Sequence, residues 1–294
     1  YNYGAAVLRA VGDTRRPLVF LVISGAVNAI LNMVLVILFH LDVEGVAIAT
    51  VISQMISCVL VLRCLCKTDA CYQLHFSKLA INGKYLRQIF QVGVPAGIQS
   101  TVINFSNVLL QSSVNSFGSI AMAANNLLGF LYTSINSVTQ ACMSFTSQNY
   151  GVKKTKRMDR VLVDCIILSI LIATVMGGAF YVFGPQILSV YNKEPDVIKS
   201  GMEILSFTTL TYFLCGIMDL FPGAMRGMGR SGVPMILSII GTVGTRIFWI
   251  YVIFPRNRAL DVLFISYPVS WGLTIAMQVC CFILVRRKVH REIQ

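Results

Sequence analysis

Eight long apolar runs constrain the fold of this sequence more than any other feature. Each contains about 20 residues or more, enough to cross roughly 30 Å of hydrocarbon as an α-helix. Because backbone groups in lipid must be hydrogen-bonded within the protein, we predict a helix for each run. The sequence therefore predicts an all-α integral membrane protein, a polytopic helical bundle. The expected spans are Pro17–Phe39, Gly45–Leu65, Ile89–Val114, Ile120–Ser147, Val161–Phe183, Ser200–Met225, Gly232–Phe254 and Asp261–Val285.

The basic residues are unevenly distributed between the loops that connect these spans. The formal net charge is +12, which by itself would also suit a nucleic-acid-binding protein. Most of the 24 Lys and Arg residues, however, lie in alternate loops and at the C-terminal end, whereas the intervening loops contain only Lys193, Lys199, Arg256 and Arg258. The positive-inside rule then places the basic loops and the C-terminus in the cytoplasm. We expect these basic residues to face a lipid bilayer and not to bind nucleic acid.

A short motif occurs twice, at a constant offset of 217 residues. The copies, Leu8–Pro17 and Met225–Pro234, share the pattern R-x-x-G-x-[ST]-x-x-P. Six predicted spans separate them, so both copies lie on the same side of the membrane in the same orientation. The fixed spacing favours a duplication into two parallel six-helix repeats, although two unrelated turns could have converged on Gly, Arg and Pro. The shared residues are Arg9, Gly12, Pro17, Arg226, Gly229 and Pro234.

We predict a structural role for this motif at the cytoplasmic ends of the helices. Glycine permits a tight turn, Thr14 or Ser231 can cap the next helix, and proline suits its first turn. The register of the repeat implies that about three spans precede this sequence. The predicted organisation is the remainder of an N-terminal lobe at 1–66, a cytoplasmic inter-lobe linker at 67–87 and a C-terminal lobe at 88–294.

Five segments, by their order and spacing, resemble the multidrug and toxic compound extrusion (MATE) family. No single one of them is diagnostic. They are L-R-A-V-G-D-T-R-R-P at 8–17, V-G-V-P-A-G-I-Q-S at 92–100, F-T-S-Q-N-Y-G at 145–151, C-G-I-M-D-L-F-P-G-A-M-R-G-M-G at 215–229 and S-Y-P-V-S-W at 266–271.

The resemblance implies a MATE-like two-lobe architecture with an incomplete first lobe. Residues 1–66 would contain the end of the family's helix 4 with helices 5 and 6, and residues 88–294 would contain helices 7–12. It further implies a monomeric antiporter of the bacterial cell (inner) membrane. Such a protein exports drugs or other small organic compounds, driven by inward movement of H⁺ or Na⁺ and without a cofactor.

Several spans carry polar residues along one helical face. Such faces either join helices through hydrogen bonds or line a water-filled cavity. One or two polar groups per helix suffice to join helices, so the longer sets favour a substrate cavity in a central cleft. The predicted cavity residues are Ser100, Asn104, Asn107 and Gln111 on one span, Thr133, Asn136 and Gln140 on the next, and Asn28 and Asn32 in the first lobe.

Asp219 is the most deeply placed acid, one turn before Pro222, which should break or kink its helix. We predict either an ion-coupling role for Asp219 or a structural one as the partner of a cytoplasmic arginine such as Arg226. A direct ion pair with the mid-span Arg246 is possible rather than expected. MATE proteins often place an essential acid on the first or seventh helix, and the span corresponding to the seventh, Ile89–Val114, contains no acid.

The sequence predicts neither a catalytic site nor a metal site, because His40, His75 and His290 lie far apart and the nine cysteines lack zinc-ligand spacing. An alternative transporter is a lipid-linked oligosaccharide flippase of related architecture, which would need a strongly cationic cleft. A truncated transporter without activity of its own is another alternative. A membrane-embedded enzyme would need His, Asp or Glu clustered at one depth, and the sequence has no such cluster.

Overall fold

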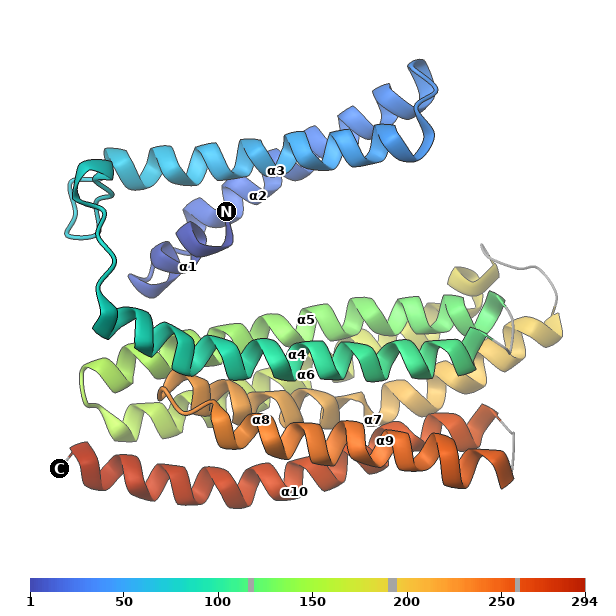
Figure 1. Ribbon diagram of the computed structural model, residues 1–294. Helices are drawn as coiled ribbons and strands as arrows, with labels where there is room; N and C mark the ends of the chain where they lie inside the picture. The colour runs from blue at the N-terminus through green and yellow to red at the C-terminus, as the bar shows by residue number, and fades with distance from the viewer. Residues whose placement is uncertain (116–118, 190–194, 257–259, 294) are drawn as a thin grey trace. The chain divides into compact units, whose positions relative to one another are not determined.

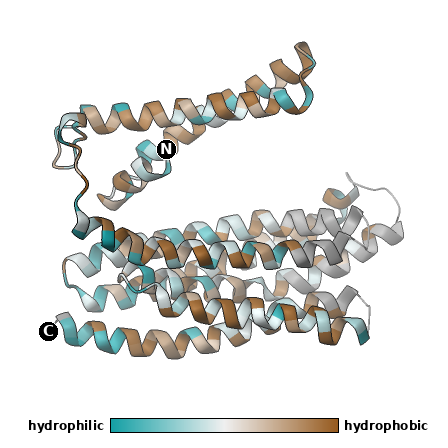
Figure 2. Cartoon of the chain, viewed as in Figure 1, coloured by the Kyte–Doolittle hydropathy of each residue, from teal (hydrophilic) through white to brown (hydrophobic). Residues whose placement is uncertain are grey.

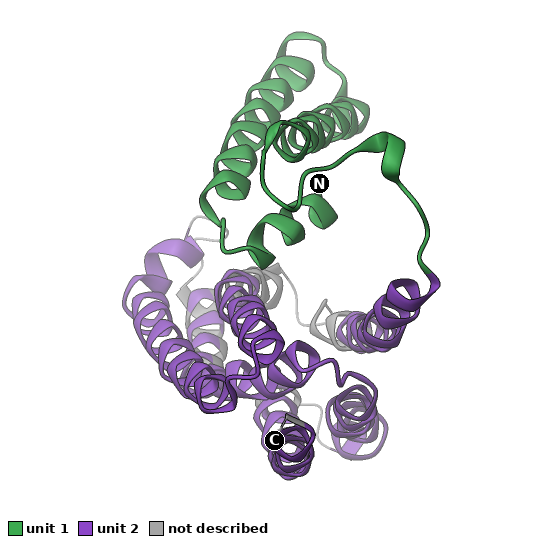
Figure 3. Cartoon of the chain, turned by 90° about the vertical axis from the view of Figure 1, so that its left-hand side faces the viewer, with its two compact units in different colours: residues 1–82 green, residues 83–294 purple. Residues whose placement is uncertain are grey.

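The computed structural model divides into two compact units, Tyr1–Asn82 and Gly83–Gln294, each built from helices (Figure 3). The boundary falls inside the predicted linker, 67–87. The structure describes residues 1–115, 119–189, 195–256 and 260–293. Within these ranges, side chains are described except at 109–115, 119–127, 195–197, 199–200, 203–204, 207–208, 260–261, 263 and 293.

Unit 1 contains two long helices that pack along each other and a short helix before them. The buried side of the second long helix repeats every four residues, from Gly45 through Ser53 to Val61. Leu8, Val61 and Leu65 form the apolar core of this unit. Its elements are α1 (Asn2–Ala10), α2 (Arg15–Met33), which continues through the π-helical segment η1 (Val34–Leu38), α3 (Asp42–Lys67) and the single turn η2 (Phe76–Lys78).

Unit 2 contains six long helical segments in its described part, drawn lengthwise in Figure 1. Five are α4 (Gly83–Asn115), α5 (Ser119–Gly151), α6 (Thr155–Ser189), α7 (Pro195–Gly227) and α10 (Leu260–Ile293). The sixth is interrupted by π-helical turns and consists of α8 (Gly232–Ser238), η3 (Ile239–Gly244), α9 (Thr245–Phe248), η4 (Trp249–Ile253) and η5 (Phe254–Arg256).

These helices confirm the predicted all-α polytopic fold. Five segments are, within the described residues, long and apolar enough to cross a membrane: Arg15–Leu38, Asp42–Lys67, Thr155–Ser189, Gly232–Arg256 and Phe264–Glu292. Figure 2 shows hydrophobic residues along the helices and hydrophilic ones at the C-terminal end of α10. Of the break or kink predicted at Pro222, the break does not occur, because α7 remains helical to Gly227, and the kink stays a prediction.

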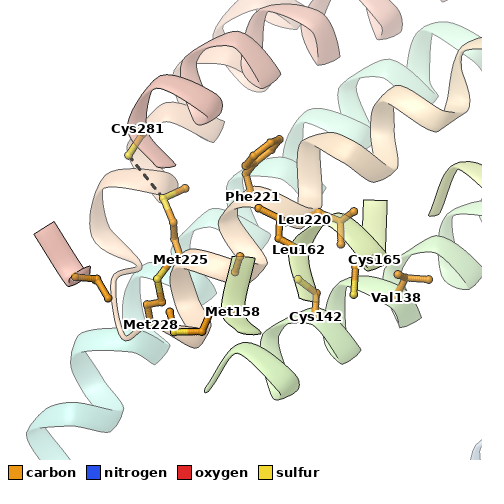
Figure 4. Close-up of a cluster of buried hydrophobic side chains, with 12 residues drawn as sticks. Val138, Cys142, Met158, Leu162, Cys165, Leu220, Phe221, Met225, Met228 and Cys281 are labelled. Atoms are coloured by element: carbon orange, nitrogen blue, oxygen red, sulfur yellow. Dashed lines mark hydrogen bonds between the residues drawn. The ribbon is translucent and has the colours of Figure 1, made fainter. Parts of the chain in front are cut away.

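Helix α7 is central to unit 2, where it contacts α5, α6 and α10. One core cluster, shown in Figure 4, includes Leu220 and Met225 of α7, Val138 and Cys142 of α5 and Leu162 of α6. A second cluster includes Leu131, Ile135 and Leu205, and it extends to Tyr212 and Trp271. These buried side chains hold α7 in a fixed position, so any polar group on its remaining face is positioned by the packing.

Glycines on α7 permit this close packing. A methyl group at Gly227 would lie 2.8 Å from the carbonyl oxygen of Met143, and one at Gly223 would lie 2.9 Å from Cγ2 of Thr139. Both distances are shorter than ordinary van der Waals contact. Helices α5 and α7 therefore approach each other at a separation that only glycine permits, as small residues commonly allow in membranes.

A polar seam joins α10 to the segment that contains α8 and η3. Ser266, Ser270, Thr274 and Gln278 recur every fourth residue on α10, and each is fully buried. Gln278 donates 2.9 Å hydrogen bonds to the carbonyl of Pro234 and to the hydroxyl of Ser238, and the hydroxyls of Thr274 and Thr242 lie 3.1 Å apart. These are the interhelical hydrogen bonds expected between membrane helices.

The two copies of the repeated motif adopt the same backbone turn. Gly12 and Gly229 have positive φ angles of 91° and 75°. The glycine N–H donates to the carbonyl of Arg9 or Arg226, at 3.0 Å and 2.9 Å, and the next N–H donates to Leu8 or Met225 at 3.0 Å and 2.9 Å. Both helices therefore end in a Schellman motif with glycine in the left-handed conformation.

Candidate functional site

Unit 2 encloses a partly open cavity of about 220 Å³ whose lining residues come from every long helical segment of this unit except α6. Segments far apart in sequence thus contribute to one site. The lining residues are Ile103 and Asn107 of α4, Leu128, Gly129 and Tyr132 of α5, Tyr212, Cys215, Met218 and Asp219 of α7, Thr242 of η3, Arg246 of α9, and Tyr267 and Trp271 of α10.

The cavity contains a buried cation, Arg246, with only 4% of its surface exposed. Its Nη1 donates a 2.7 Å hydrogen bond to Oδ1 of Asn107, and its guanidinium carbon lies 4.8 Å from the ring centroid of Tyr267. The π-helical turn η3 ends two residues before Arg246. Such turns are rare and occur frequently at functional sites.

Asp219 contributes a carboxylate to the same cavity and is half-buried. It interacts electrostatically with the hydroxyl of Tyr132 and with the guanidinium groups of Arg226 and Arg246. Among the described residues, however, no cationic nitrogen lies within 4.0 Å of it. The direct ion pair with Arg246, left open by the sequence, is therefore not formed in this structure.

Aromatic rings form much of the remaining wall. Trp271 lies edge-on to Tyr212, with ring centroids 5.4 Å apart, and edge-on to Tyr267 at 5.6 Å. The Tyr212 hydroxyl donates a 3.1 Å hydrogen bond to the carbonyl of Leu128, which fixes this ring between α5 and α7. Such edge-to-face contacts hold aromatic side chains in defined orientations. The cavity thus combines rigid apolar walls with two opposite charges.

The structure brings Asn107 and Asp219, two of the sequence-predicted residues, into this cavity. Ser100, Asn104, Thr133 and Gln140 are exposed on α4 and α5, and Asn136 of α5 is half-buried. None of these five lines the cavity described here. The Thr133 hydroxyl donates to the carbonyl of Gly129 at 2.9 Å, so its polarity is satisfied within its own helix. The side chain of Gln111 lies outside the described residues.

The two asparagines predicted for the cavity in unit 1, Asn28 and Asn32, are hydrogen-bonded to each other. Nδ2 of Asn32 donates a 3.1 Å hydrogen bond to Oδ1 of Asn28, one turn earlier on α2. The amide oxygen of Asn32 is buried and has no hydrogen-bond partner among the described residues. Both side chains are half-buried. Their assignment to a substrate surface stays a prediction.

The second motif copy is anchored to α4. Arg226 donates a 2.8 Å hydrogen bond to Oε1 of Gln99, and the Ser231 hydroxyl donates to the carbonyl of Gln91 at 2.9 Å. Thr14 and Ser231 occupy the predicted N-cap positions, yet neither side chain makes the capping hydrogen bond. For Ser231 the reason is visible, because its hydroxyl joins two helices instead. Pro17 and Pro234 are buried within the first turns of their helices, as predicted.

Sequence reasoning missed the aromatic part of the site. Tyr267 and Trp271 lie in the S-Y-P-V-S-W segment, and Tyr212 lies two turns before Asp219 on α7. Their helical spacing was a usable signal, since residues four or seven apart share a face. The sequence alone did not show that faces of α5, α7 and α10 converge at the depth of Arg246.

Comparisons with known proteins agree with this architecture. The profile of the MatE family matches residues 95–252. The "Probable multidrug resistance protein YoeA" of Bacillus subtilis (strain 168) is 27% identical over 92% of this chain and 61% of its own length. The "Multidrug export protein MepA" of Staphylococcus haemolyticus (strain JCSC1435) is 24% identical over 94% of this chain and 60% of its own length. The chain thus spans about three fifths of these relatives.

A solved structure shows the same fold. The crystal structure of a MATE protein in complex with MaL6 superposes with a TM-score of 0.86 at 18% sequence identity, and the match covers 98% of this chain and 66% of that one. At this identity the similarity establishes the fold alone. The profile, by contrast, matches more than half of the sequence directly. This chain therefore belongs to the MATE family of efflux transporters.

Proposed function

We propose that this protein is a secondary active antiporter that exports drugs or other small organic compounds, coupled to inward movement of H⁺ or Na⁺. The two relatives named above are described as a multidrug resistance and a multidrug export protein. The observation that carries the proposal is Asp219, a carboxylate in a cavity of a membrane bundle without a salt-bridge partner among the described residues. Intramembrane acids of this kind are costly and usually functional.

In this proposal Asp219 is the coupling group. A carboxylate that is surrounded by phenol, guanidinium and aromatic groups can gain and lose a proton, and its charge alters the field across the cavity. Arg246 and Arg226 interact with the charged form, so protonation would change the forces between α7 and its neighbours. The coupling step would thereby favour one arrangement of the bundle over another.

The repeated motif supports a mechanical part of the proposal. Rigid Schellman turns at Gly12 and Gly229 and the hydrogen bonds from Arg226 and Ser231 to α4 keep the helix ends together. We propose that these cytoplasmic corners let each bundle move as a body during alternating access. We place the C-terminus in the cytoplasm of a bacterial cell and take the protein to act as a monomer. The polar residues on α4 and α5, with Asn28 and Asn32, remain our candidates for contact with substrate.

A lipid-linked oligosaccharide flippase is the alternative. It would need a surface with several cations for a diphosphate-bearing lipid, whereas the described cavity contains one arginine and one aspartate. This near balance of charge favours an exporter of small compounds.

Reconstituted vesicles test the proposal. The protein, expressed from its native reading frame, is placed in proteoliposomes that contain ethidium, and dye export is followed after imposing either a pH gradient or a Na⁺ gradient. Export that depends on one of the gradients and stops when it collapses is the expected result. Gradient-independent movement of a fluorescent lipid, with no dye export, would support the flippase instead.

A further inference from the structure

Arg246 carries a permanent positive charge, and the surrounding groups among the described residues compensate it only in part. Its side chain is 4% exposed and lies in the middle of a membrane helix. Its hydrogen-bond acceptor is the neutral amide of Asn107, its flat face rests on Tyr267, and its buried Nε has no partner in the described part of the chain. No carboxylate oxygen in that part lies within 4.0 Å of the guanidinium.

A purely structural arginine would be expected to be paired. Guanidinium groups remain protonated in proteins, so burial cannot neutralise this one. Buried charges are stable when an opposite charge and hydrogen bonds compensate them, and otherwise they are strongly unfavourable. Asp219 lines the same cavity yet makes no ion pair with Arg246. The arrangement thus keeps a cation available beside the cavity.

Aromatic side chains form the cavity wall next to that cation. Tyr212, Tyr267 and Trp271 form a fixed aromatic cluster, and the indole Nε1 of Trp271 is a second buried donor without a described acceptor. The volume of about 220 Å³ is below the roughly 300–1,000 Å³ of pockets for whole drug-sized ligands. The cavity therefore fits one ring of a larger compound together with a small charged substituent.

We infer that Arg246 is a specificity-determining residue that binds the carboxylate of an aromatic substrate, whose ring packs against Tyr267 and Trp271. Arginine suits this role because its planar donors match the two oxygens of a carboxylate. The site would then favour aromatic carboxylates, including zwitterions, over compounds that carry a positive charge alone. The inference rests on the proposed function in that it takes the ligand to be a transported compound.

Two dyes that differ only at the carboxyl group test this inference. Rhodamine 110 has a free carboxyphenyl group, and rhodamine 123 is its methyl ester. Binding of each dye to the purified protein in lipid nanodiscs is measured by fluorescence polarisation. We expect rhodamine 110 to bind about tenfold more tightly, and Arg246→Gln to remove that preference by weakening rhodamine 110 alone. Arg246→Lys, which retains the charge, should keep part of the preference.

The controls separate recognition from folding. Arg256→Gln removes an exposed cation of η5 and should leave both affinities unchanged. Equal binding of the two dyes to the native protein, no saturable binding of either, or an equal loss of both in Arg246→Gln would overturn the inference. If Arg246→Gln does not fold, the ratio of the two dye affinities, measured in the native protein and in Arg246→Lys, still tests the inference. Absence of gradient-driven export, with the affinity ratio of the two dyes intact in the native protein, would refute the proposed function and leave Arg246 as a residue that binds aromatic carboxylates.

Discussion

Asn107 accepts a 2.7 Å hydrogen bond from Nη1 of Arg246, which connects α4 to α9 in the middle of the unit 2 bundle. The bond holds the Asn107 side chain at a cavity that also contains Asp219. Asn107, which the sequence indicated by its helical spacing, thus binds Arg246, the mid-span cation to which the sequence assigned no partner. A charged hydrogen bond of this kind restricts the guanidinium more than a neutral bond would.

Asp219→Asn should abolish coupling while leaving the bundle folded. The amide is nearly the same size as the carboxylate but cannot exchange a proton or carry a charge. We expect gradient-driven ethidium export to fall by at least about tenfold, equivalent to 1.4 kcal/mol in the transport barrier. The measurement is initial export rate in proteoliposomes at matched protein content.

Asp164→Asn is the matched control for this experiment. Asp164 is exposed on α6 and lies 3.7 Å from Arg160, in a surface pair that contributes little. The export rate of the Asp164→Asn variant should equal that of the unmodified protein. Retention of full coupled export by Asp219→Asn would exclude Asp219 as the coupling group and favour its structural interpretation.

Gly229→Ala should destabilise the protein because residue 229 has a φ of 75°. A Cβ in the left-handed region costs about 1–2 kcal/mol, although no neighbouring atom lies within 4 Å of the added methyl. Gly232→Ala adds a methyl in equally open space without a positive φ. Thermal aggregation of the purified protein in detergent should therefore begin at a lower temperature for Gly229→Ala only. Equal behaviour of the two variants would show that the turn is not strained by a side chain.

Gly227→Ala should weaken the contact between α5 and α7. Its methyl would lie 2.8 Å from the Met143 carbonyl oxygen and 2.9 Å from Cβ of Thr146, so the helices have to separate. Overpacking of this kind costs about 1–3 kcal/mol. Gly178→Ala on α6 has open space and should instead gain up to about 1 kcal/mol from better helix propensity. The two variants should shift the melting temperature of the protein in detergent in opposite directions. Shifts in the same direction would contradict the close approach of α5 and α7.

Cys71 provides a test of membrane orientation. It is exposed in the connector after α3, which the positive-inside rule places in the cytoplasm. In a variant with Cys71 as the sole cysteine, a membrane-impermeant maleimide should label inside-out vesicles and not intact cells. A cysteine introduced at Arg256 in a cysteine-free protein should show the reverse pattern. Labelling of Cys71 in intact cells would invert the proposed topology.

The helical spans were predictable because the bilayer imposes a simple rule on sequence. A run of about 20 apolar residues must be helical in lipid, whatever its neighbours are. The paired glycines were predictable for a similarly local reason, since glycine adopts the left-handed conformation seen at Gly12 and Gly229 without the steric cost of a Cβ. The N-cap hydrogen bond predicted for Ser231 was wrong because a partner on another helix, the carbonyl of Gln91, competes for its hydroxyl.

The cavity depended on packing that no local pattern reveals. Spacing placed Asn104 and Asn107 on one face of α4, but only the rotation of α4 against the segment around η3 and α9 decides that Asn107 meets Arg246. Likewise the sequence identified Asp219 as a mid-span acid, while its nearness to Tyr132 and its lack of an ion pair follow from how α5 and α7 pack. Sequence by itself determined which segments are helices and where they turn, because those depend on local backbone chemistry and on the lipid. Tertiary structure decided which side chains share a cavity, because helix rotation and depth are set by contacts between residues distant in the chain.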